Sequence, residues 1–182
     1  MKEPALGVIE LNSLARGVVV TDVMVKKAPV RIVSSHPICP GKFLIVIAGE
    51  VDDVNEAMEA GRHYGGYTMN DFVLIENLHP YILPAMQGSA EVPEIRALGI
   101  VETYASPSAI VAADAACKAA GVRLIELRLA NGLGGKAYFT MTGDLHEVQA
   151  AMEGAVKAID SGLLIRTETI AAPHDQLKPT LY

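Results

Sequence analysis

The sequence lacks several features that would place it in other classes of protein. No apolar run approaches the roughly 18 residues that cross a membrane, and residues 43–48, for example, have only the length of a strand. The first residues contain no apolar core followed by a cleavage site, as an export signal would. Two cysteines, Cys39 and Cys117, do not make a disulfide framework. We therefore expect a soluble, cytosolic protein.

Positive charge is also scarce. The chain has 15 Lys and Arg against 21 Asp and Glu, a net charge of −6. An acidic surface repels phosphate backbones and anionic lipid, so neither nucleic acid nor a membrane is expected as a partner. The hydrophobic content of 51% excludes disorder, because enough surface can be buried to offset the entropy cost of folding. The 182 residues allow one ordinary domain or two small ones.

The chain repeats itself in order over nearly its whole length. Residues 5–10 read ALGVIE, and residues 97–102 read ALGIVE. The same register, with a two-residue insertion in the second copy, aligns Asp22 with Asp114, Lys26 with Lys118, Gly41-Lys42 with Gly135-Lys136, and Ala57-Met58-Glu59 with Ala151-Met152-Glu153. These matches predict two homologous domains, residues 1–90 and 91–182, joined near the turn-forming stretch Gly88–Glu94.

Both halves show the same order of secondary-structure signals. Short runs rich in β-branched and apolar residues predict strands at 7–11, 30–34, 43–48 and 72–76, and again at 99–104, 122–127, 137–142 and 163–167. Helical spacing separates the first strand from the second and the third from the fourth. Ser106 followed by Pro107 indicates a helix start with a serine N-cap, and Asp144 with Glu147 resembles a capping box. Each half is therefore expected to be an α+β, split βαβ domain of ferredoxin-like type, an antiparallel sheet with helices on one face.

The spacing of these repeated residues resembles a known domain. The first copy carries Glu10…Gly17…Asp22…Lys26…Ala28…Val30, Gly41-Lys42, Gly49-Glu50…Val54…Ala57-Met58, and the second carries Glu102…Ala109…Asp114…Lys118…Ala120…Val122, Gly135-Lys136, Gly143-Asp144…Val148…Ala151-Met152. Both resemble the bacterial microcompartment shell-protein (BMC) domain. Two such domains in one chain resemble the tandem-domain, trimer-forming members of that family. The stretch at residues 38–44, ICPGKFL, is similar to the branch found in propanediol-utilisation microcompartments.

This resemblance implies a structural role in a microcompartment shell. Three chains would form a homotrimer, a pseudohexameric tile that meets other shell proteins edge to edge around encapsulated enzymes. Lys26 and Lys118 would lie at the tile edges, although solvated lysines at helix ends would have the same sequence signature. The family often carries an edge arginine near the end of the domain. Neither 77–80 (NLHP) nor 171–174 (AAPH) contains it here.

The resemblance also places one loop of each half at the central axis, as a pore. The pore-loop residues are His36, Ile38, Cys39, Pro40 and Gly41 in the first half and Asn131, Gly132, Leu133 and Gly134 in the second. Three Cys39 thiols would converge there, and the resemblance implies that they hold a 4Fe-4S cluster for electron transport or cluster transport, served by a redox partner. Two alternatives stay open, a Cys39 that is merely a small apolar residue and an axis that is an open pore for small polar metabolites. Cys117, among helix-forming alanines, is interpreted as core packing.

Other functions have less support in the sequence. The stretch Gly132–Lys136 superficially suggests a phosphate-binding loop, but a strand rather than a helix is expected after it. The five histidines show no metal-ligand spacing, and no nucleophile and base occur together, so an enzyme is not expected. A regulatory trimer that binds small molecules remains an alternative, because the same fold carries many functions.

Overall fold

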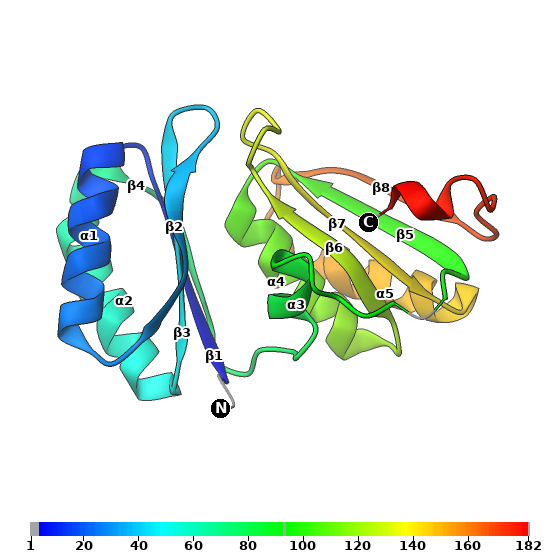
Figure 1. Cartoon of the computed structure of the whole chain (residues 1–182), viewed down its shortest axis with the longest axis horizontal. Coiled ribbons are helices and arrows are strands. Elements are labelled where there is room, and N and C mark those ends of the chain that lie inside the picture. Colours follow the sequence, from blue (N-terminus) through cyan, green and yellow to red (C-terminus); the bar gives the residue numbers. More distant parts are fainter. Residues whose placement is uncertain (1–3, 93, 182) are drawn as a thin grey trace. The chain divides into compact units, whose positions relative to one another are not determined.

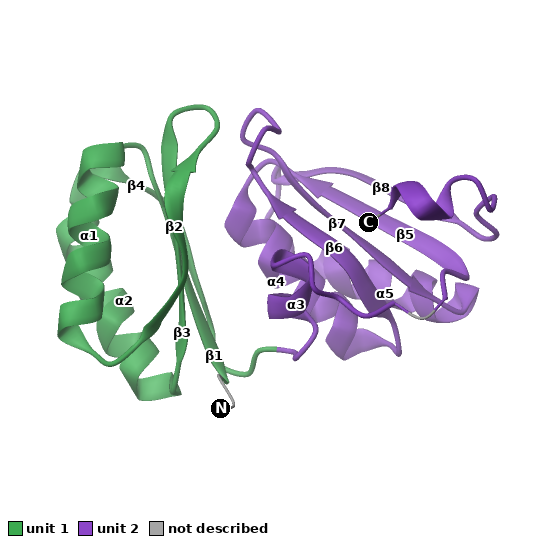
Figure 2. Ribbon diagram, viewed as in Figure 1, with its two compact units in different colours: residues 1–78 green, residues 79–182 purple. Residues whose placement is uncertain are grey.

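The protein consists of two compact units. The computed structural model describes residues 4–92 and 94–181, and the chain divides between Leu78 and His79 (Figure 1, Figure 2). This division falls before the 90/91 boundary expected from the sequence. The reason is a short helix that the sequence did not predict, α3 (Ile82–Met86), which packs on strand β6 of the second unit. Residues 79–90 therefore belong structurally with the second half.

The first unit is a four-stranded antiparallel sheet covered by two helices. Its elements are β1 (Ala5–Leu11), α1 (Leu14–Lys27), β2 (Arg31–Ile38), β3 (Lys42–Gly49), α2 (Val51–Gly65) and β4 (Met69–Ile75), with a 3₁₀ turn at Gly66–Thr68. The strand order is β2-β3-β1-β4, and every pairing is antiparallel. Both helices lie on the same face of the sheet (Figure 1).

The second unit repeats this topology. Its elements are α3, β5 (Ala97–Thr103), α4 (Ser106–Ala119), β6 (Arg123–Leu129), β7 (Ala137–Gly143), α5 (Leu145–Ala158) and β8 (Leu164–Ile170), followed by a 3₁₀ turn at Lys178–Thr180. The order β6-β7-β5-β8 matches that of the first unit strand for strand. The predicted α+β fold, two split βαβ domains with helices on one face of each sheet, is confirmed.

The alternation of side chains along β1 explains how the first unit closes its core. Ile9 and Leu11 point to the helical face, where they pack with Val20 and Met24 of α1 and with Met58 of α2. All five are nearly or fully removed from solvent. Burial of side chains of this size stabilises a fold by about 1.5–3 kcal/mol each, so this layer holds the helices on the sheet.

The two predicted helix starts have different outcomes. The capping box of α5 is present, and the Glu147 carboxylate accepts a hydrogen bond from the backbone N–H of Asp144 at 3.3 Å. The predicted N-cap of α4 is wrong by one residue, because Ala105 is the extended cap residue and Ser106 already belongs to the helix. Pro107 is compatible with either start, because it would be the first or the second residue of the helix. The backbone N–H groups at both positions have no acceptor within a helix, so a proline is tolerated at either one.

Candidate functional site at the β2–β3 hairpin

Cys39 lies in the short turn that joins β2 to β3. Only Cys39, Pro40 and Gly41 connect the two strands, and the backbone N–H of Gly41 donates to the carbonyl of Ile38 at 3.0 Å. Gly41 has φ +81°, a left-handed conformation that favours glycine. The Cys39–Pro40 peptide bond is cis. Cys39 is partly exposed, whereas Ile38 beside it is buried, so the turn begins next to a residue that is packed in the core.

Polar contacts fix the strand that leads into this turn. The His36 ring lies 2.7 Å from the Ser34 hydroxyl through Nδ1, and the Ser35 hydroxyl lies 2.9 Å from that of Thr21 on α1. Thr21 in turn donates to the carbonyl of Gly17 at 2.8 Å. The edge strand β2 is thereby tied to α1, and His36 is held on the strand two positions before the buried residue Ile38.

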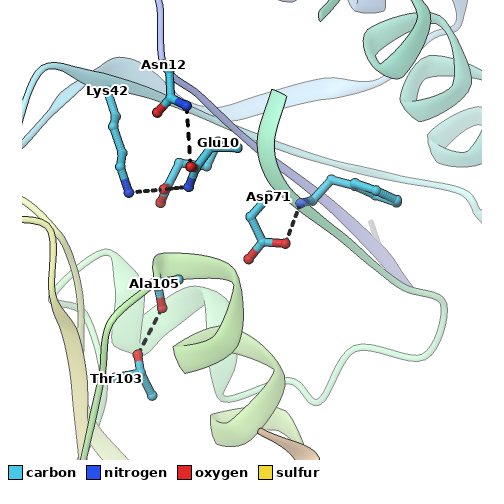
Figure 3. A network of polar contacts seen from close by, with 8 residues as sticks. Glu10, Asn12, Lys42, Asp71, Thr103 and Ala105 are labelled. Atoms are coloured by element: carbon cyan, nitrogen blue, oxygen red, sulfur yellow. Dashed lines mark hydrogen bonds and ion pairs between the residues drawn. The ribbon is translucent and has the colours of Figure 1, made fainter. Parts of the chain in front are cut away.

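A buried carboxylate lies beside the other end of the turn. Glu10 of β1 is fully buried, and Oε1 accepts hydrogen bonds from Lys42 Nζ at 2.7 Å and from Asn70 Nδ2 at 2.6 Å (Figure 3). Its Oε2 has no hydrogen-bond partner within the described part of the chain. Lys42 is the first residue of β3, so this ion pair fastens the hairpin to the central strand.

The equivalent loop of the second unit has a different chemistry. It runs from Ala130 to Lys136, and its backbone has positive φ at Ala130, Gly132, Gly134 and Gly135. Asn131, Gly132 and Gly134 are exposed and Leu133 is half-buried. The Lys136 N–H donates to the carbonyl of Leu133 at 3.2 Å, and β7 follows, so no helix is present to complete a phosphate-binding loop. The loop contributes no thiol.

The ion pair beside the turn was not expected from the sequence, although both partners belong to the repeated motif. Lys136 Nζ lies 3.1 Å from Glu102 Oε1, which repeats the pairing of Lys42 with Glu10. The signal was present in the sequence, because residues of opposite charge recur at the same two positions in both halves. Only the antiparallel pairing of β1 with β3 and of β5 with β7 reveals that they meet.

The two predicted tile-edge lysines occupy equivalent positions. Lys26 lies in the last turn of α1 and pairs with Asp22 at 2.6 Å, and Lys118 pairs with Asp114 in the last turn of α4. A cation at the C-terminus of a helix also favours the helix dipole. Both lysines are at least partly exposed in the chain, and their role at a tile edge stays a prediction.

The second cysteine has a packing role, as the sequence indicated. Cys117 is buried on α4, and burial raises the pKa of its thiol to about 12, with a further contribution from the nearby carboxylate of Asp114. A thiol with such a pKa remains protonated at neutral pH and is a poor metal ligand. Met58 and Met152, which the repeat aligns with each other, are likewise buried.

Of the two cysteines, Cys39 is the more exposed and is therefore the better candidate for a metal ligand. Iron–sulfur clusters are held by cysteine thiolates, and a partly exposed cysteine on a short hydrogen-bonded turn suits that chemistry. Within residues 4–92 and 94–181, no group of three or more His, Cys, Asp or Glu side chains gathers in one chain. The donor type therefore fits a cluster, provided that several chains each supply one Cys39.

Among the described residues, no helix combines the length and the apolar character needed to cross a membrane.

Comparison with known proteins identifies both repeats. The BMC domain family matches residues 5–77 and 97–173. Over 174 residues the chain is 38% identical to the bacterial microcompartment shell protein PduT of Citrobacter freundii, covering 95% of both chains. It is 35% identical over 88 residues to the carboxysome shell protein CcmK1 of Thermosynechococcus vestitus, covering 47% of this chain and 76% of the relative.

A solved structure agrees with this likeness over the whole chain. The crystal structure of a microcompartment protein from Desulfitobacterium hafniense superposes with a TM-score of 0.89 at 38% identity, covering 96% of this chain and 98% of the other. The family match, the sequence relatives and the shared fold all indicate a shell component rather than an enzyme. The chain belongs to the BMC-domain family of bacterial microcompartment shell proteins, with two BMC domains in tandem.

Proposed function

We propose that the protein forms a homotrimeric, pseudohexameric tile of a microcompartment shell, and that three Cys39 thiolates on its central axis hold a 4Fe-4S cluster. The observation that supports the cluster most directly is the position of Cys39, a partly exposed cysteine on the short turn between two paired strands. The tile itself follows from the tandem BMC domains, because proteins of this family assemble into shells.

Symmetry supports a ring of three chains. Two units of the same topology in each chain give six similar positions around a threefold axis, which closes the assembly. The Cys39 turn and the loop of Ala130–Lys136 occupy equivalent places in the two units, so they would alternate around the axis. Since the second loop has no cysteine, the ring would have one thiol for every two positions, three in total.

The residues around Cys39 hold its turn in place. The Gly41 N–H closes the turn on Ile38, and the ion pair of Lys42 with Glu10 anchors the strand that follows. Three thiolates would bind three irons of a cubane cluster and leave the fourth open to water, a small ligand or a redox partner. When bound, the cluster supplies one-electron chemistry or is itself the cargo, which fits electron transport or cluster transport across a shell.

A tile with an open pore is the second candidate. The exposed residues Asn131, Gly132 and Gly134 favour it, because the two glycines have no side chain and the asparagine side chain is short and polar. Such a lining would suit small polar metabolites. The two candidates share the tile and differ in whether iron occupies the axis.

Iron and acid-labile sulfide in anaerobically prepared protein distinguish them. Wild-type protein should be brown, contain about four irons per three chains and give an electron paramagnetic resonance signal after reduction. Cys39→Ala should be colourless, while the matched control Cys117→Ala should keep its iron. A Cys39→Ala protein that holds as much iron as wild type would overturn the cluster and leave the open pore.

The tile has its own test, the formation of flat sheets or tubes by overexpressed protein in electron micrographs. Lys26→Ala and Lys118→Ala should reduce these assemblies if the lysines lie at the tile edges. Exposed glutamates on α2, such as Glu59, provide a control substitution that should leave the sheets intact. Sheets that are unaffected by both lysine variants would exclude the edge role.

A further inference from the structure

An apolar face of the first unit is open to solvent. Helix α1 and the edge strand β2 enclose a groove of about 740 Å³ whose walls include Leu14, Val18, Asp22 and Ile32. The exposed fractions of the apolar side chains are 44% for Leu14, 62% for Val18 and 42% for Ile32. Several exposed aliphatic side chains on one helix and the adjacent edge strand mark a surface that a partner would cover.

The equivalent face of the second unit is buried. The repeat places Leu14 opposite Ser106, Val18 opposite Ile110, and Ile32 opposite Leu124. These three residues of the second unit are exposed by 2% or less. Asp22 and Asp114 differ in the same way, since the side chain of Asp22 is 56% exposed and that of Asp114 only 9%. The same surface is thus present twice, once covered and once open.

The segment that begins at His79 lies on this face of the second unit. Helix α3 of this segment packs on α4 and β6. The backbone N–H of His79 donates to Asp114 Oδ1 at 2.8 Å, while Asp114 Oδ2 pairs with Lys118. The Arg123 guanidinium lies 5.0 Å from the centroid of the Tyr81 ring. The segment that follows the last strand of one repeat therefore binds α4 through the aspartate of its Asp–Lys pair.

The last strand of the second repeat, β8, is followed by a turn of the same design at His174. The His174 ring Nδ1 accepts from the Gln176 N–H at 3.2 Å, and the carbonyl of His174 accepts from the Leu177 N–H at 2.9 Å. In the same way, the His79 ring Nδ1 accepts from the Tyr81 N–H at 3.4 Å, and the carbonyl of His79 accepts from the Ile82 N–H at 3.1 Å. The two histidines are structural counterparts.

Two groups lack the partners that their counterparts have. Within residues 4–92 and 94–181, the His174 N–H donates to no acceptor, and Asp22 Oδ1 accepts from no donor, although Asp22 Oδ2 binds Lys26. His174 is exposed, as is Asp22. A backbone N–H and a carboxylate oxygen are complementary in charge, and hydrogen bonds to an ionised acceptor are among the stronger ones.

We propose that the α1–β2 face binds the turn at His174 of a second copy of this chain, with the His174 N–H donating to the partner's Asp22. This inference rests on the proposed trimer and names the contact that closes it. Each chain would offer one open face and one free turn, so the interface is head-to-tail, and three such contacts close a ring. The contact would repeat between chains the bond that His79 makes with Asp114.

Disulfide crosslinking between differently tagged chains tests this contact. One chain carries Asp22→Cys and the other His174→Cys, both with Cys39→Ala so that thiols at the axis cannot contribute. The double variant His79→Cys/Asp114→Cys in one chain is the positive control, because the structure shows that contact. A chain with Glu59→Cys, at an exposed position of α2, replaces the Asp22→Cys chain as the negative control.

Mild oxidation should yield a species of two chains from the Asp22→Cys and His174→Cys pair, and none from the Glu59→Cys pair. The mass of the assembly in solution is measured on the same samples and on wild type. A trimeric mass without the crosslink, while the positive control forms its intrachain disulfide, would overturn the contact and leave the tile intact. A monomeric mass would overturn the tile together with the contact.

Discussion

Gly17 of α1 and Phe43 of β3 pack in direct contact, two residues after the turn that carries Cys39. A Cβ placed on Gly17 would lie 2.3 Å from the Phe43 ring, so only glycine lets the helix approach this side chain. The equivalent positions of the second unit hold two alanines, Ala109 and Ala137, both fully buried. The first unit therefore combines the smallest residue with a large aromatic one at these two positions, whereas the second unit combines two small residues.

Gly17→Ala should destabilise the first unit by about 1–3 kcal/mol, because the added methyl group overpacks against an aromatic ring. Helix propensity alone would act in the opposite direction, since alanine is favoured over glycine within a helix. The free energy of unfolding in urea measures the change. Adding Phe43→Ala should make the two substitutions non-additive. A single variant that is more stable than wild type would contradict the packing argument.

Lys42→Met should cost about 3 kcal/mol, because it leaves the buried carboxylate of Glu10 without its cation. The matched substitution is Lys136→Met, whose partner Glu102 is 34% exposed. It should cost less than about 1 kcal/mol, as exposed ion pairs do. Urea unfolding of both variants checks the difference. Equal costs would mean that the burial of Glu10 does not determine the effect.

Stability should fall in acid partly through His79. Burial lowers the pKa of His79, with Asp114 opposing and Lys118 reinforcing the shift. The unfolded chain therefore takes up this proton first, near its ordinary pKa of about 6.5, and stability declines as the pH drops below that value. His79→Asn should reduce the loss of urea resistance between neutral pH and pH about 5. Substitution of the exposed His146 should leave this loss of urea resistance unchanged. An equal reduction in the His79 and His146 variants would argue against the role of His79.

The two thiols should differ sharply in reactivity. In the native apoprotein, Cys39 is partly exposed, whereas Cys117 is buried with a pKa of about 12. Since the thiolate is the nucleophile, a maleimide or disulfide reagent should titrate one thiol per chain rapidly, and the second only in denaturant. Cys117→Ala should leave the rapid phase unchanged. Loss of the rapid phase in Cys117→Ala, rather than in Cys39→Ala, would reverse the assignment.

The repeat made the fold predictable from the sequence. All eight predicted strands and the four predicted long helices occur within the described residues where the periodicity indicated them, with ends that differ by a few residues. Strand β2 is the clearest difference, since it extends to Ile38 where the sequence suggested an end at residue 34. His36 and Pro37 interrupt the apolar pattern there, but β2 is an edge strand and tolerates proline.

Helix α3 and the position of the division between the units could not be predicted in this way. The five residues of α3 are too few to show a helical period, and their stability comes from packing on α4 and β6. The candidate site was predictable only in part. Cys39, Gly41 and Lys42 stood out in the motif, but the link from Lys42 to Glu10 depends on strand register.

In the proposed tile, three chains bring three Cys39 sulfurs to one point. Native mass spectrometry of anaerobically purified protein tests it most directly, because it weighs the assembly and its inorganic content together. We expect a trimer that carries the additional mass of one 4Fe-4S cluster, and a trimer without that mass for Cys39→Ala. A monomer, or a trimer whose iron content is the same in the Cys39→Ala variant, would contradict it.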